Sequence, residues 1–261
     1  MDEHELNKAV WAAGEWEPIA ALIAGAGPRL LDDVPVGPGL EVLDVATGSG
    51  SSIAIPAAQR GATVVGCDLT PGNLVAAQRG AEAADVGVEW VEANAQDLPF
   101  DDDRFDRVFS TFGHMFAPDQ VKAGAELIRV CKPGGTIAIA AWTPDGAAGG
   151  LLEVIGRYLP VRPGSPSADR WGDPDEVRRL LPGIELRFHT DAVVIEFPTV
   201  EEYAEFYAEK FGPMVVARRA VGDRWQALYD DVLEFYRQTN TATDGTSRAS
   251  IEYLVTIGTK S

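Results

Sequence analysis

The sequence of 261 residues contains only two cysteines and three histidines. Cys67 and Cys131 lack the close spacing of a zinc motif, and the histidines are scattered at His4, His114 and His189. We therefore expect no metal site. We also expect both cysteines to be reduced core residues, Cys67 at the end of a strand and Cys131 at the end of a helix.

Basic residues are also scarce, because 22 Lys and Arg stand against 40 Asp and Glu and leave a formal net charge of −18. Such a surface repels phosphate backbones, and no basic cluster offsets it, so we expect no nucleic-acid partner. We interpret the acidity as a contribution to solubility. The sequence has no signal segment and no apolar run of membrane-spanning length, which predicts a cytoplasmic protein without a membrane partner.

Residues 40–68 carry the strongest pattern in the sequence. The β-branched, apolar run over 40–46 predicts a strand buried on both faces. The small residues over 47–52 form a turn that lets the backbone approach a ligand, and their hydroxyls are expected to cap a helix that ends at Gly61. A second strand over 62–67 leads to Asp68, twenty residues after Gly48. A carboxylate at that edge of a parallel sheet can bind the hydroxyls of a ribose, which predicts a nucleoside cofactor.

The turn distinguishes between two such cofactors. A dinucleotide fingerprint requires a third glycine, where this chain has Ile53. Asp44 precedes the turn, and its carboxylate would attract an ammonium group and repel a pyrophosphate. These features favour S-adenosyl-L-methionine (SAM), with its amino-acid tail, over NAD.

Four segments in order now carry a family resemblance: LDVATGSG at 43–50, CDLTPGNLVAAQ at 67–78, EANAQDLPFDDDRFDRVFS at 92–110 and LIRVCKPGGTIAIAAW at 127–142. Together they resemble the class I SAM-dependent methyltransferases, and most closely the bacterial small-molecule enzymes of the ubiquinone/menaquinone-methyltransferase type. The resemblance is strong over 40–142 and weak after it. Two positions depart from the family pattern: Ala46 replaces the first glycine of the turn, and Asn94 replaces an aspartate.

The resemblance implies a Rossmann-like α/β fold, with a doubly wound, mostly parallel sheet of seven strands in one domain. Residues 1–38 would form an N-terminal helical lid, and 39–145 the SAM-binding core. Residues 146–261 would form a substrate cap with a helical insert before the last strand. The regular alternation of predicted strands and helices up to Trp142 independently favours a parallel, doubly wound sheet.

The resemblance also implies a set of residues around SAM and its product, S-adenosyl-L-homocysteine. Asp44 and the backbone of 46–50 would hold the methionine tail and Asp68 the ribose, while the amide of Asn94 would accept from and donate to the adenine. The complete predicted set is Trp11, Asp44, Ala46, Thr47, Gly48, Gly50, Asp68, Leu69, Asn94, Ala95, Gln96 and Ser110.

Two features near the cofactor allow two interpretations each. His114 follows the fourth predicted strand and would lie near the sulfonium, where it could act as a general base or merely hydrogen-bond the methionine portion or the backbone. Trp11 and Trp16 lie in a segment that resembles the lid of related enzymes, but they could equally dock these helices onto the sheet. The sequence leaves both pairs of alternatives open.

After residue 143 the pattern changes. We expect a helix over 147–159, a mobile proline-rich loop over 161–167, a capped helix over 175–181, and two antiparallel edge strands over 184–197 and 251–258. Between those strands, Tyr203, Phe206, Tyr207 and Phe211 share one face of a helix. Such a stripe is usually core, but it could instead wall an apolar substrate pocket.

The sequence therefore predicts methyl transfer from SAM to a small organic acceptor through an oxygen, nitrogen or activated carbon nucleophile. The transfer would be an in-line displacement, which requires alignment more than acid–base chemistry. A SAM-binding regulator without turnover is the first alternative. An NAD-linked oxidoreductase is the second, and both Ile53 and the lack of a second mononucleotide-binding half count against it.

Overall fold

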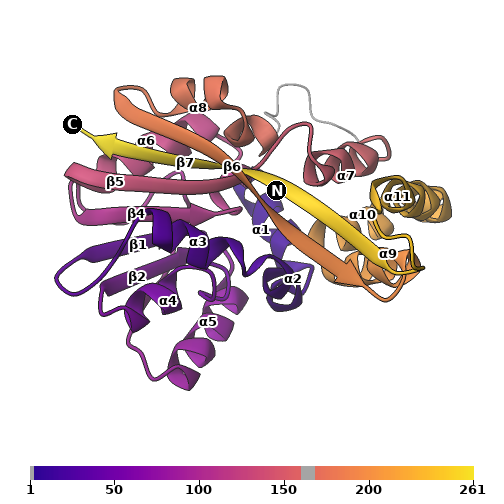
Figure 1. The fold of residues 1–261 in the computed structure, drawn as a ribbon, viewed down its shortest axis with the longest axis horizontal. Helices are drawn as coiled ribbons and strands as arrows, with labels where there is room; N and C mark the ends of the chain where they lie inside the picture. The colour runs from indigo at the N-terminus through magenta and orange to yellow at the C-terminus, as the bar shows by residue number, and fades with distance from the viewer. Residues whose placement is uncertain (1–2, 160–167) are drawn as a thin grey trace.

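The computed structural model describes residues 3–159 and 168–261, so the proline-rich loop predicted over 161–167 lies outside the described residues. The described chain forms a seven-stranded sheet in the order β3-β2-β1-β4-β5-β7-β6 (Figure 1). Its strands are β1 Glu41–Val45, β2 Thr63–Asp68, β3 Glu89–Glu92, β4 Phe105–Thr111, β5 Cys131–Trp142, β6 Ile184–Phe197 and β7 Ser247–Lys260. Strands β1 to β5 are parallel, and β7 runs antiparallel to both β5 and β6. The predicted doubly wound sheet with an antiparallel edge pair is confirmed.

Helices cover both faces of this sheet. The N-terminal helices are α1 Glu3–Ala12, α2 Trp16–Ile23 and α3 Ala26–Asp33, and those of the core are α4 Ala54–Gln59, α5 Pro71–Ala83 and α6 Gln120–Val130. Neighbouring residues of β1 point to opposite faces, so Val42 packs with α3 and α4, whereas Leu43 packs with α6 and with α8 (Pro174–Leu180). Because both faces are covered, β1 and β2 are buried along almost their whole length, whereas the edge strand β6 alternates polar and apolar residues. None of the described helices is long and apolar enough to cross a membrane.

The helices of the insert lie beyond the carboxyl ends of the parallel strands. Strands β6 and β7 are 14 residues long each and project past the other strands toward the insert (Figure 1). They carry α9 Val200–Lys210, α10 Gly212–Val221 and α11 Trp225–Thr239, beside α7 Ala147–Gly156. Helix α10 ends just before Gly222, where φ is +56°, a conformation that favours glycine.

Several predicted boundaries were wrong. The predicted hydroxyl cap is absent from α4, which begins at Ala54; the Asp44 carboxylate accepts a hydrogen bond from the N–H of that residue instead. Cys131 begins β5 rather than ending a helix, because it pairs with Phe105 ahead of a register irregularity. The last strand begins at Ser247 because it pairs with the whole length of β6. Both cysteines are buried and unpaired, as predicted.

Candidate functional site

The Asp68 carboxylate joins the glycine turn to the end of β2. Its Oδ2 accepts a hydrogen bond from the N–H of Gly48 at 2.8 Å, and its Oδ1 accepts from the N–H of Thr70 at 2.8 Å and from Asn73 Nδ2 at 3.1 Å. Burial raises the pKa of Asp68, while these hydrogen bonds lower it. The carboxylate is therefore held in one orientation at the wall of a pocket, and a carboxylate has capacity for a further donor such as a ribose hydroxyl.

This pocket, called the cofactor pocket below, has a volume of about 690 Å³ and opens partly to solvent. It is lined by Asn7, Trp11, Trp16, Ala46, Asp68, Leu69, Thr70, Asn73, Ala93, Asn94, Ala95, Phe112, Gly113, His114, Phe116 and Ala117. The structure thus brings together seven residues of the predicted site: Trp11, Ala46, Asp68, Leu69, Asn94, Ala95 and His114. The other six predicted residues do not line the pocket: Asp44, Thr47, Gly48, Gly50, Gln96 and Ser110.

Asp44 organises the turn from within the core. Its Oδ2 accepts hydrogen bonds from the hydroxyl of Thr47 at 2.5 Å and from the N–H of Ala54 at 3.2 Å. Its Oδ1 has no hydrogen-bond partner among residues 3–159 and 168–261, and burial raises its pKa to about 7. Asp44 is fully buried and does not line the pocket, so its predicted contact with the ammonium of SAM stays a prediction.

Ala46 adopts a backbone conformation that favours glycine. Its φ is +56°, in the left-handed region, and the family pattern has glycine at this position. Gly113 packs against it so closely that a Cβ added there would lie 2.4 Å from the Cβ of Ala46. The turn therefore retains its shape despite the missing glycine, at the cost of local backbone strain.

Gln96 holds the side chain of Asn94, the residue predicted to contact the adenine. The side-chain oxygen of Asn94 accepts hydrogen bonds from the backbone N–H of Gln96 at 3.0 Å and from its Nε2 at 3.1 Å. Gln96 Oε1 in turn accepts from the N–H of Asp119 at 2.6 Å. Gln96 therefore fixes the Asn94 side chain, and a hydrogen bond donated by the adenine amine to Asn94 Oδ1 would have to replace one of these two.

His114 lies in a short 3-10 helix, η1 (His114–Phe116), at the carboxyl end of β4. Its backbone N–H donates to Ser110 Oγ at 3.3 Å, and its ring meets that of Trp171 edge to face at 4.4 Å. The side chain is buried, and neither ring nitrogen has a hydrogen-bond partner within the described chain. Burial lowers the pKa of His114 to about 3, so its imidazole is neutral near pH 7.

The sequence did not single out Asn73, which donates to Asp68 and lines the pocket. The signal was present, because Asn73 is the third residue of the helix that starts after Asp68, and its side chain can reach back to the strand end. These polar groups fit an adenosyl cofactor: a fixed carboxylate, two nearby amides and a buried imidazole with unsatisfied nitrogens surround one pocket.

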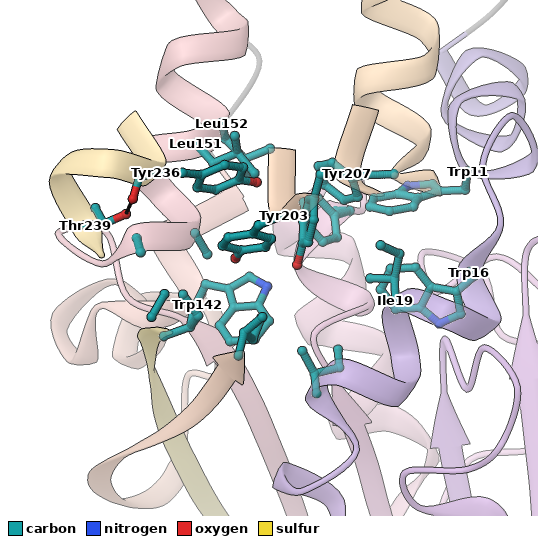
Figure 2. Close-up of a pocket in the computed structure, with 18 residues that line it drawn as sticks. Trp11, Trp16, Ile19, Trp142, Leu151, Leu152, Tyr203, Tyr207, Tyr236 and Thr239 are labelled. Carbon is teal, nitrogen blue, oxygen red and sulfur yellow. Dashed lines mark hydrogen bonds between the residues drawn. The ribbon is translucent and has the colours of Figure 1, made fainter. Parts of the chain in front are cut away.

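A second pocket, called the acceptor cavity below, adjoins the first (Figure 2). It has a volume of about 690 Å³, part of it open to solvent. Trp11, Trp16 and Phe116 line both pockets, and the rings of Trp11 and Phe116 lie 4.6 Å apart. The remaining wall comes from α2, α7, α9, α11 and the sheet: Ile19, Ile23, Trp142, Ala147, Ala148, Leu151, Leu152, Ile195, Tyr203, Tyr207, Phe211, Tyr236, Thr239, Ala249 and Ile251.

The aromatic stripe of α9 takes part in this wall. Tyr203, Tyr207 and Phe211 line the cavity, while Phe206 packs on Phe197 with their ring centroids 5.2 Å apart. Figure 2 shows Tyr203 beside Trp142 and Tyr207 beside Trp11. The two interpretations of the stripe are therefore compatible, because these residues are buried and also surround a cavity.

Comparison with known proteins agrees with this geometry. Residues 42–135 match the family described as "Methyltransferase domain". Two uncharacterized proteins of Mycobacterium tuberculosis are each 40% identical to the chain over 222 residues, which is 83% of this chain and 81% of each relative. A demethylmenaquinone methyltransferase of Clavibacter sepedonicus is 48% identical over 101 residues, or 39% of this chain and 40% of that enzyme. The crystal structure of a Bacillus halodurans protein has the same fold, with a TM-score of 0.64 and 23% identity, over 90% of this chain and 98% of that one.

Proposed function

Because the chain belongs to the class I SAM-dependent methyltransferases and uses SAM as its cofactor, we propose that it methylates a small organic acceptor held in the acceptor cavity. The observation that supports this proposal is the shared wall. Trp11, Trp16 and Phe116 line both pockets, so a ligand in the acceptor cavity would lie beside one in the cofactor pocket. The acceptor atom is an oxygen, a nitrogen or an activated carbon.

SAM supplies an electrophilic methyl group on a sulfonium when it is bound. The chain's own residues then have to align the acceptor with that methyl group and exclude water. Asp68 and Asn94 would hold the nucleoside, and Trp11 and Phe116 would hold the acceptor against it. His114 would lie nearest the transfer. With its pKa near 3 it is a weak base, so we assign it a hydrogen bond to the methionine portion or the acceptor rather than storage of a proton.

The test is product formation from labelled SAM with a panel of phenols, amines and quinone precursors. Leu152→Trp would fill the cavity from α7 and should abolish product formation while SAM affinity, measured by calorimetry, stays unchanged. Glu153→Gln, on the exposed side of the same helix, is the matched control and should retain activity. Tight SAM binding without product from any acceptor would instead support a SAM-binding regulator.

A further inference from the structure

The wall of the acceptor cavity contains a buried hydroxyl that has no partner. Tyr236 is 3% exposed and lines the cavity from α11. Its hydroxyl makes no hydrogen bond within the part of the chain that the structure describes. Burial, and then the neighbouring Tyr203 and Tyr207, raise the pKa of Tyr236. Burying a hydroxyl without a hydrogen bond costs free energy, which indicates that a ligand atom supplies the missing partner.

Two other polar groups of this wall already have partners. Trp11 Nε1 donates to Asn7 Oδ1 at 3.1 Å, and the hydroxyl of Thr239 donates to the carbonyl of Phe235 at 3.0 Å. No residue that lines the cavity in the described ranges carries a charge at neutral pH. A charged ligand would therefore lose its hydration without gaining a countercharge.

The walls are flat and aromatic on several sides. Tyr203 stacks on Tyr236 with ring centroids 4.1 Å apart and planes 16° apart, and Tyr207 meets Tyr203 edge to face at 5.1 Å (Figure 2). Trp142 lines the same space and stacks on Phe112. Such surfaces favour a planar, polarisable ring over a branched or hydrated molecule.

We propose that the acceptor is an uncharged molecule with a planar ring and an oxygen that hydrogen-bonds to the Tyr236 hydroxyl. This inference rests on the proposed function. Tyr236 is then a specificity-determining residue. Burial raises the pKa of Tyr236 well above its usual range, so the phenol stays protonated and acts as a neutral hydrogen-bonding group rather than a base.

The test uses three probes of the same ring size, titrated into the full chain with S-adenosyl-L-homocysteine bound and followed by tryptophan fluorescence. They are naphthalene, 2-naphthol and the 2-naphthoate anion. We expect 2-naphthol to bind about fivefold more tightly than naphthalene, and 2-naphthoate to bind at least about tenfold more weakly than 2-naphthol. Equal or tighter binding of the anion would overturn the inference.

Tyr236→Phe keeps the ring stack and removes only the hydroxyl, so it should abolish the preference for 2-naphthol over naphthalene. Tyr229→Phe, on the same helix but outside the cavity wall, is the matched control and should retain the preference. A preference that survives in Tyr236→Phe would contradict the assignment. The proposed function fails separately: the predicted order of binding without methylation of any acceptor would refute methyl transfer and leave the cavity's selectivity intact.

Discussion

Asp68 Oδ2 and the backbone nitrogen of Gly48 lie 2.8 Å apart, although twenty residues separate them in the chain. The contact fixes the glycine turn after β1 against the end of β2. It also orients the carboxylate at the wall of the cofactor pocket. One side chain therefore shapes the turn and presents the group expected to bind the ribose.

Asp68→Ala should weaken SAM binding at least about a hundredfold in calorimetry, because it removes a charge-assisted partner of the ribose. It also leaves the N–H groups of Gly48 and Thr70 without their acceptor, so the free energy of unfolding should fall by about 1–3 kcal/mol. Asp68→Asn keeps the size and one acceptor and should lie between Ala and the wild type in both measurements. Unchanged affinity in a folded Asp68→Ala protein would refute the ribose assignment.

His114 should make the protein less stable as the pH falls. Its pKa is about 3 in the folded chain and 6.5 ordinarily, so the unfolded chain binds a proton below pH 6.5 that the folded chain rejects until about pH 3. His114→Phe removes this titration. Between about pH 7 and 5, urea unfolding should show the wild type losing about 2 kcal/mol more than the variant. Parallel losses in the two proteins would show that the imidazole is not held neutral.

Asp44 should act in the opposite direction when no ligand is bound. Its pKa is about 7 in the folded chain against 3.8 ordinarily, so its contribution to stability is complete below pH 3.8 and is lost as the pH rises toward 7. Asp44→Asn can still accept from Thr47 and Ala54 and cannot ionise. We expect the wild type to lose roughly 2 kcal/mol more than the variant between about pH 5 and 7. Unfolding curves with the same pH slope would contradict the raised pKa.

Ala46→Gly should stabilise the fold by up to about 1 kcal/mol, because glycine adopts a φ of +56° without strain. Gly113→Ala is the complementary change: its Cβ would lie 2.4 Å from that of Ala46, and we expect a loss of about 1–3 kcal/mol. Thermal unfolding of both variants tests the pair. If Ala46→Gly were instead less stable than the wild type, the packing of the Ala46 methyl group would stabilise the fold by more than its strained backbone destabilises it.

The sequence by itself determined the layered sheet and the position of Asp68 after β2, because apolar runs and glycine turns are local signals that survive without tertiary contacts. Which polar residues line the pocket was decided only by the tertiary structure: Asn73 lines it, whereas Gln96 does not and instead donates to Asn94. The acceptor cavity is also a product of the tertiary structure alone. The ring centroids of Trp11 and Phe211 lie 6.2 Å apart although these residues are far apart in the sequence, and Tyr236 reaches the cavity from a third element. No local pattern encodes such a space, because its shape depends on how distant helices pack around the ends of β6 and β7.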